Sequence, residues 1–143
     1  MAIVLFDLQQ TPNALIDLAN QTLSRLLRSY FKRYGEIGSK RWWTLYADGK
    51  LTVTRIAGEI THIGPAKDQF DEEHDIIRIQ TDRRDIEYDR TDYWRDPRLQ
   101  LGSWVAIEQV KIIAPHAYGN DTHILDVRVI LMENSLLSLR PGT

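Results

Sequence analysis

Hydrophobic positions along the chain follow two different periods, and these divide it into a helical part and a β-rich part. Between residues 12 and 34 apolar side chains recur every three or four positions, which predicts one amphipathic helix. Thr11 and Pro12 form a helix-start signal, and Gly35 is typical of a helix end. From residue 42 onward short apolar runs with a two-residue period predict strands.

The longest predicted strand is Leu51–Gly64, LTVTRIAGEITHIG. Its apolar positions begin on a two-residue period and then slip phase near Gly58. A slip of this kind indicates a β-bulge or a sharp bend, because one extra residue turns the inward side chains outward. A long bent strand can serve both sides of a small barrel, so we expect the remaining strands to close around it.

Four further strands and one short helix are predicted after the long strand. Before it we expect a strand at Trp42–Tyr46 that turns at Ala47–Gly49, and a short edge strand or flap within Met1–Gln10. The later segments are strands at residues 76–79, 84–88, 103–113 and 122–132, with the helix at residues 91–96.

This order resembles that of the OB-fold, a five-stranded Greek-key barrel with its helix between the third and fourth strands. The segment Thr91–Asp96 occupies that position, and Leu101–Ile107 (LGSWVAI) is similar to the Gly-led entry to the fourth strand. The expected fold class is therefore an all-β barrel with added helices: an OB-fold with an N-terminal amphipathic helix. An SH3-like barrel, or an α+β sheet crossed by the helix, are the alternatives.

The length of 143 residues predicts a single domain with a core of ordinary size. The apolar run Ala2–Phe6 is too short for a signal peptide or a membrane span, so we expect an intracellular soluble protein. The expected divisions are an N-terminal segment (residues 1–41, helix at about 12–34), the barrel (42–133) and a C-terminal tail (134–143).

Charge is unevenly distributed along the chain, although the net charge is only −2. Residues 1–58 hold eight Lys and Arg against four Asp and Glu, whereas residues 59–96 hold six against twelve. A protein that grips a phosphate backbone usually has a net basic surface, because counterion release supplies much of that affinity. The acidic middle of the chain therefore favours protein partners over nucleic acid.

The sequence contains no recognisable catalytic, metal-binding or phosphate-binding motif. The chain has no cysteine, which excludes disulfides, thiolate metal sites and a cysteine nucleophile. None of its four histidines stands four residues from another, and Glu72–Asp75 (EEHD) is interpreted as a solvated loop and not as a metal site. No phosphate-binding glycine loop or nucleophile motif is present. We expect no enzymatic activity, catalytic residue, metal or cofactor.

Within the OB-fold class, the run Asp89–Asp96 (DRTDYWRD) resembles the matching segment of telomere-associated OB proteins. These are the shelterin subunit that recruits telomerase and the small OB subunit of yeast telomerase. The resemblance implies a nuclear, telomere-associated accessory subunit that binds protein partners, including a telomerase catalytic subunit, and no membrane. By position it implies a partner-binding set consisting of Asp89, Asp92, Trp94, Arg95 and Asp96.

Single-stranded nucleic-acid binding is the alternative function. OB barrels bind single strands on their second and third strands, where aromatic side chains stack bases inside a basic groove. Acidic residues alternate with the arginines here, so we expect most of those cations to be paired and direct nucleic-acid binding to be weak. The residues that could form such a groove are Arg78, Arg83, Arg84, Tyr88 and Arg90.

Overall fold

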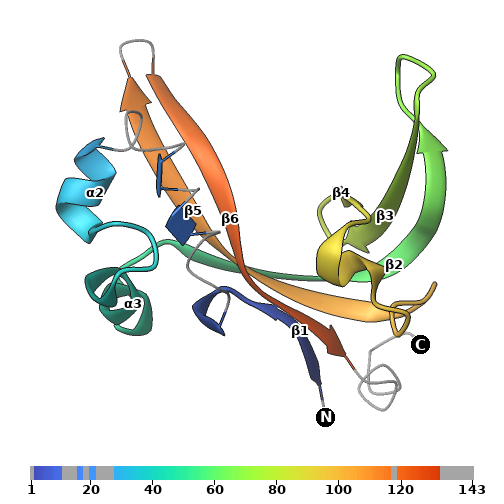
Figure 1. Ribbon diagram of the computed structural model, residues 1–143, viewed down its shortest axis with the longest axis horizontal. Helices are drawn as coiled ribbons and strands as arrows, with labels where there is room; N and C mark the ends of the chain where they lie inside the picture. The colour runs from blue at the N-terminus through green and yellow to red at the C-terminus, as the bar shows by residue number, and fades with distance from the viewer. Residues whose placement is uncertain (1, 11–15, 18–19, 22–27, 117–118, 133–143) are drawn as a thin grey trace. The chain divides into compact units, whose positions relative to one another are not determined.

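The computed structural model describes residues 2–10, 16–17, 20–21, 28–116 and 119–132 (Figure 1). The predicted C-terminal tail and much of the predicted helix at residues 12–34 lie outside these ranges. The elements are β1 (Ile3–Asp7), η1 (Leu8–Gln10), α2 (Arg28–Tyr34), α3 (Lys40–Ala47), β2 (Val53–Lys67), β3 (Glu73–Thr81), β4 (Asp85–Asp89), η2 (Asp92–Arg95), β5 (Trp104–His116) and β6 (Gly119–Met132).

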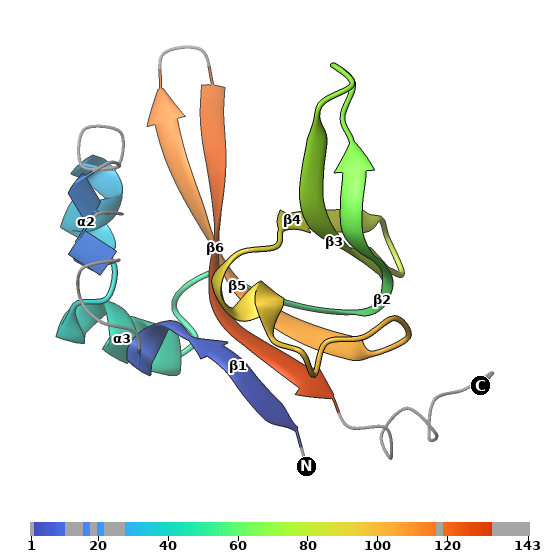
Figure 2. The same ribbon diagram turned by 45° about the vertical axis from the view of Figure 1, so that its right-hand side comes forward.

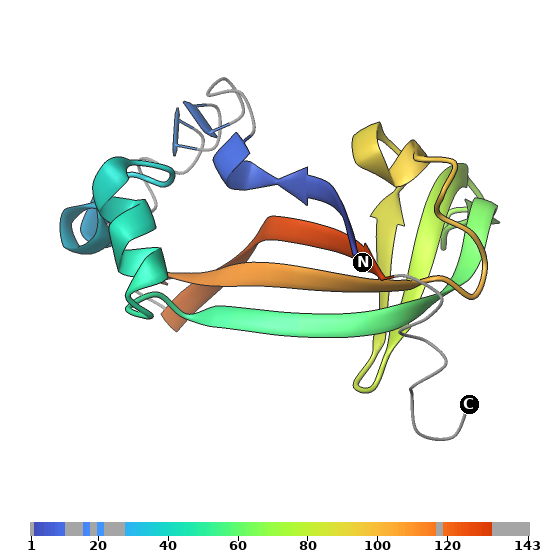
Figure 3. The ribbon, with the colours of Figure 1, turned by 90° about the horizontal axis from the view of Figure 1, so that it is seen from below.

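The strands form one six-stranded sheet in the order β1-β6-β5-β2-β3-β4. The strands β2, β5 and β6 run side by side through its centre (Figure 3). The expected β-rich fold and the order of its later elements are confirmed. The expectation of five strands in a closed barrel is not met, because the sheet has six strands and is open. The extra strand β1 pairs with β6, and β1 and β4 are the two edges.

The chain folds into two compact units, each assembled from segments far apart in the sequence. Unit 1 comprises Met1–Phe6, Ile56–Ile107 and Val129–Thr143. Unit 2 comprises Asp7–Arg55 and Glu108–Arg128. Long strands therefore contribute one part of their length to each unit.

The core of unit 1 is built around η2. Trp94, on η2, is only 4% exposed and packs among aliphatic side chains from the surrounding strands. The strand β2 curves, and η2 lies inside the curve beside β4 (Figures 1 and 2). The buried side chains of this cluster are Ile60, Ile77, Ile79, Trp94, Leu99, Val105, Ile107, Val129 and Leu131.

The phase slip predicted in the long strand is present as a register shift. The pairing of β2 with β3 shifts between Ile60 and His62, which is where a bulge accommodates the extra residue. Gly58 has a different role, two residues earlier. A Cβ atom there would lie 2.6 Å from the carbonyl oxygen of Gln80 and from a methyl group of Ile79. Gly58 thus permits a close approach of β3 to β2.

The core of unit 2 includes the α2–α3 pair. Trp42, on α3, is fully buried, and its indole nitrogen donates a hydrogen bond of 3.0 Å to the hydroxyl of Tyr30 on α2. The guanidinium of Arg41 donates to the carbonyl of Arg33 at 2.6 Å, which satisfies a carbonyl at the end of α2. The predicted helix end at Gly35 is confirmed, since its φ is +83° and its amide donates to the carbonyl of Phe31.

The strand predicted at Trp42–Tyr46 is wrong, because this segment lies within α3. The hydroxyl of Ser39 accepts a hydrogen bond from the amide of Trp42 and caps the helix. The rings of Trp42 and Tyr46, four residues apart, stack with centroids 6.0 Å apart on one side of the helix. Local capping and aromatic packing therefore outweigh the strand preference of aromatic residues.

The tight turn predicted at Ala47–Gly49 is instead the end of α3. The amide of Lys50 donates to the carbonyl of Leu45, and the amide of Gly49 donates to that of Tyr46. This pair of bonds is a Schellman motif, with Gly49 at φ +73° in the left-handed position. An Asp-Gly pair suits both a hairpin and a helix end, so the sequence alone did not separate them.

No helix among the described residues is long and apolar enough to cross a membrane.

Candidate functional site

The predicted site residues lie on β3, β4 and η2 of unit 1. The strands β3 and β4 are antiparallel, and Ile77 pairs with Tyr88 while Arg78 pairs with Glu87. Side chains alternate between the two faces of a sheet, so Ile77 and Tyr88 face the core and Arg78 and Glu87 lie on the opposite, outer face. The prediction that Tyr88 points inward is confirmed by its packing against the core cluster.

Ion pairs engage two of the arginines predicted for a nucleic-acid groove, Arg78 and Arg90. The Arg78 guanidinium donates two hydrogen bonds, of 2.9 and 2.6 Å, to one carboxylate oxygen of Glu87. The guanidinium of Arg90 lies 3.3 Å from a carboxylate oxygen of Asp75. These arginines are therefore held by neighbouring strands and do not form an open basic groove.

Positively and negatively charged side chains also line a hollow on the same face. It has a volume of about 240 Å³ and is lined partly by Ala66 and Ile76. Opposite charges at this spacing cancel much of the local potential, so the hollow selects neither anions nor cations. Its charged or titratable lining residues are Lys67, Asp68, His74, Arg78, Glu87 and Asp89.

Trp94 is buried, which separates it from the rest of the predicted partner-binding set. Its ring stacks on that of Tyr88 with centroids 4.6 Å apart, and Tyr93 stacks on Phe6 of β1 at 4.8 Å. Tyr93 and Trp94 are also in ring contact. A continuous aromatic row therefore joins β1, η2 and β4, and Trp94 serves the core of unit 1.

The remaining members of the partner-binding set lie at the surface or close to it. Asp89, Asp92 and Arg95 are exposed, and Asp96 is half-buried. The Nε atom of Arg95 donates to the carbonyl of Arg90 at 2.7 Å, so this guanidinium braces the loop that enters η2. The structure brings these four residues together around η2.

Asp96 is engaged by an arginine that the sequence analysis did not single out. Arg98 donates from Nε and from a terminal nitrogen to the two oxygens of Asp96, at 3.0 and 2.6 Å. The Arg98 side chain and its backbone amide together lower the pKa of Asp96 to about 2. The Asp-Pro-Arg spacing was the available signal, since an aspartate caps the amide two residues later.

The acidic turn between β2 and β3 is organised by Asp68. One carboxylate oxygen accepts the amides of Phe70 and Glu72, and the other lies 2.8 Å from Nε2 of His74. Ligand atoms of Asp68, Glu72 and His74 lie within 4.8 Å of one another. Both carboxylate oxygens of Asp68 are already engaged in hydrogen bonds within the turn. We therefore interpret Asp68, Glu72 and His74 as a turn motif and assign no metal to them.

The five residues predicted to bind a single strand differ in their surroundings. Arg78 and Arg90 are in ion pairs, and the ring of Tyr88 is stacked on Trp94. Arg83 and Arg84, at the β3–β4 turn, are exposed and form no ion pair with a described residue. Two of the five predicted groove residues are thus available for a phosphate.

Comparison with models of known protein families and with curated proteins finds no match to this chain.

Proposed function

We propose that this protein is a non-enzymatic OB-like accessory module that binds a basic surface of another protein. The binding surface would be its acidic face, which we define as Asp85, Asp89 and Asp92. One observation carries the proposal. The arginines Arg78 and Arg90 are held in ion pairs, whereas Asp85 and Asp92 form no ion pair with a described residue.

Net charge supports the choice of a basic partner. Unit 1 contains eight Lys and Arg against thirteen Asp and Glu in the sequence. Complementary charge accelerates association and selects partners of opposite sign, while it repels a polyanion. A protein with clustered Lys and Arg therefore suits this face better than DNA or RNA.

Strand order supports the OB-like part of the proposal. Numbered from β2 as the first barrel strand, the order from β6 to β4 becomes 5-4-1-2-3, and η2 follows the third strand. In a closed OB barrel the third and fifth strands meet. Here β1 occupies the free edge of β6, and the aromatic row from Phe6 to Tyr88 spans the remaining gap. The telomerase partner and nuclear location implied by the resemblance stay predictions.

The test is a quantitative comparison of the proteins recovered with the tagged full chain from its native cells. The test variant combines Asp85→Lys, Asp89→Lys and Asp92→Asn. The control is Glu36→Lys, which reverses the charge of an exposed acid of unit 2 and so changes total charge away from the acidic face. Asparagine is chosen at position 92 because its φ is +51°, which Asn tolerates. We expect a partner to fall at least about tenfold in the test variant only, and to dissociate at high salt.

An identical set of recovered proteins for the test variant and the wild type would contradict the proposal, provided that circular dichroism shows both folded. A partner lost equally from Glu36→Lys would show dependence on total charge and not on the acidic face.

Single-strand binding at the β3–β4 turn is the second candidate. It is favoured only by Arg83 and Arg84, which form no ion pair with any residue that the structure describes. Its test is a titration of fluorescent oligothymidylate at two salt concentrations, with wild type and with the double variant Arg83→Gln/Arg84→Gln. Strong salt-sensitive binding that this double variant abolishes would replace the protein-binding proposal. We expect the double variant to change nothing.

A further inference from the structure

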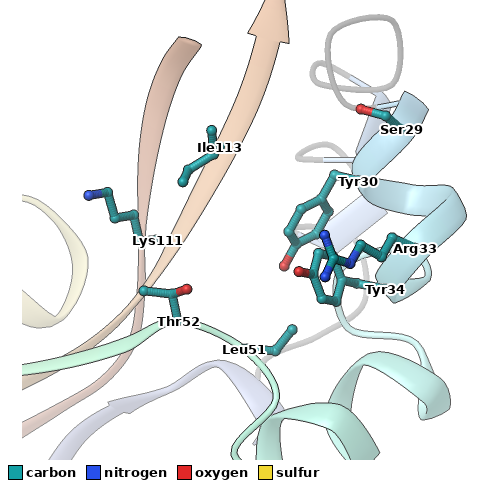
Figure 4. Close-up of a pocket in the computed structure, with 8 residues that line it drawn as sticks. All are labelled: Ser29, Tyr30, Arg33, Tyr34, Leu51, Thr52, Lys111 and Ile113. Atoms are coloured by element: carbon teal, nitrogen blue, oxygen red, sulfur yellow. The ribbon is translucent and has the colours of Figure 1, made fainter.

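Unit 2 contains a cavity of about 390 Å³ between α2, the start of β2 and β5. This volume lies within the range of small-molecule sites, about 300 to 1,000 Å³. Figure 4 shows its lining: Tyr30, Arg33 and Tyr34 project from α2 toward Leu51, Thr52 and Ile113. Among the described residues that line it, none is acidic.

Three side chains of α2 that carry hydrogen-bond donors line this cavity. The rings of Tyr30 and Tyr34 have centroids 4.7 Å apart, and the guanidinium of Arg33 lies on the same side of the lining (Figure 4). The Arg33 guanidinium lies 5.1 Å from the centre of the Tyr34 ring, and this cation–π contact holds its planar group in place. No ion pair with a described residue uses that guanidinium, in contrast to Arg78 and Arg90 of unit 1.

The hydroxyl of Tyr30 is available as a hydrogen-bond donor. It accepts a hydrogen bond from the indole nitrogen of Trp42, a donor-only group, so its own proton is left for another acceptor. A tyrosine hydroxyl is protonated at neutral pH, and burial of the ring raises the pKa of Tyr30 further. Arg33, Tyr34 and Tyr30 thus offer donors and no carboxylate, the arrangement that suits an anion.

The opposite wall combines the apolar side chains of Leu51 and Ile113 with the polar side chain of Thr52. Ile113 is 45% exposed, which is high for a large aliphatic side chain, whereas Leu51 is buried. An anion alone would leave Ile113 in water, whereas a ligand with an attached ring would cover it. Lys111 adds a second positive charge at the rim, with its ammonium turned away from the rings.

We propose that this cavity binds a nucleoside phosphate, with its phosphate on Arg33 and the tyrosine hydroxyls and its ring system against Leu51 and Ile113. The guanidinium fork and two hydroxyls match the several oxygens of a phosphate. The phosphate can belong to a free nucleotide or to the end of a single strand. The inference is independent of the acidic face, which lies in unit 1.

The test measures binding to the full chain by calorimetry, with adenosine 5′-monophosphate, adenosine and inorganic phosphate as probes. We expect the nucleotide to bind at least about tenfold more tightly than either adenosine or phosphate alone. Arg33→Gln should weaken nucleotide binding at least about tenfold. The matched control Lys32→Gln removes one positive charge from the same helix but lies outside the cavity, and it should bind like the wild type.

A second variant, Ile113→Asp, places a negative charge on the exposed wall and should abolish nucleotide binding without disturbing the core. Oligothymidylate bearing a 5′-phosphate distinguishes the two sources of the ligand. If it binds more tightly than the nucleotide and Arg33→Gln weakens it, the source is a strand. If it does not bind, the source is a free nucleotide.

Three results would overturn the inference. The first is no detectable nucleotide binding at millimolar concentration. The second is equal weakening by Arg33→Gln and Lys32→Gln, which would indicate general charge attraction. The third is inorganic phosphate binding as tightly as the nucleotide, which would leave the apolar wall without a role.

Discussion

The two units of this protein differ in the sign of their net charge and in whether an arginine faces a cavity. Unit 1 has a net formal charge of −5, and ion pairs hold four of its cations in place. Unit 2 has ten Lys and Arg against seven Asp and Glu, for a net charge of +3, and ion pairs hold Arg55 and Arg128 there. Arg33 of unit 2 instead faces a cavity whose described lining contains no acidic residue.

This difference shows that total charge says little about what a protein binds. An arginine held by a neighbouring carboxylate contributes to local order, and it releases no counterion from a bound polyanion. An arginine without such a partner can receive a ligand phosphate. The net charge of −2 is the sum of −5 in unit 1, which would repel a phosphate, and +3 in unit 2, which can attract one.

The largest expected effect is on the aromatic centre of unit 1. Trp94→Ala removes a buried ring that stacks on Tyr88 and fills the core, and we expect a loss of about 3–5 kcal/mol in the free energy of unfolding. Urea denaturation measures it. Trp94→Phe retains a ring and should lose clearly less. If alanine costs under about 1 kcal/mol, Trp94 is not the centre of this core.

The next effect concerns the close approach of β3 to β2 in the same unit. Gly58→Ala places a methyl group 2.6 Å from the carbonyl oxygen of Gln80, so the backbone must shift at a cost of about 1–3 kcal/mol. The neighbouring exposed position provides the control, and Ala57→Ser should change stability by no more than about 0.5 kcal/mol. Thermal unfolding followed by circular dichroism compares the two variants.

An effect of similar size is expected in the helical part of unit 2. Tyr30→Phe leaves the buried indole N–H of Trp42 without its acceptor, at a cost of about 1–3 kcal/mol. Trp42→Phe in the Tyr30→Phe background removes the orphaned donor, so a double-mutant cycle isolates the hydrogen bond. Strictly additive losses would show that the bond adds nothing to stability.

The smallest effect is the pH dependence of the turn at Asp68. The carboxylate of Asp68 raises the pKa of His74, and the amide of Glu72, with the His74 side chain, lowers the pKa of Asp68. The contribution from His74 is full below its ordinary pKa and is lost as pH rises through the raised value. The contribution from Asp68 is present above its ordinary pKa and is lost as pH falls through the lowered value.

Nuclear magnetic resonance titration checks this prediction. The imidazole of His74 should titrate above 6.5 in the wild type, and Asp68→Asn should return the midpoint toward that value. A midpoint at or below 6.5 in the wild type would show that the Asp68–His74 contact does not persist in solution.

Local pattern was enough to predict most elements of unit 1 from the sequence. The phase slip in the long strand, the short helix at residues 91–96 and the inward side of Tyr88 were all visible as breaks or alternation in hydrophobic period. The prediction of a strand at Trp42–Tyr46 was wrong because aromatic residues, which favour strands, also occur in helices. Its capping serine and its terminal glycine decided for a helix.

What the sequence determined by itself was which segments of unit 1 extend or turn, where charge accumulates and that cysteine chemistry is excluded. Those properties depend on composition and on residues close together in the chain. The open sheet with β1 at its edge, the burial of Trp94 and the placement of Arg33 and Ile113 on one cavity depend on contacts between distant segments. Only the tertiary structure decides such contacts, because long-range pairing is selected by the packing of the whole core and not by any local pattern.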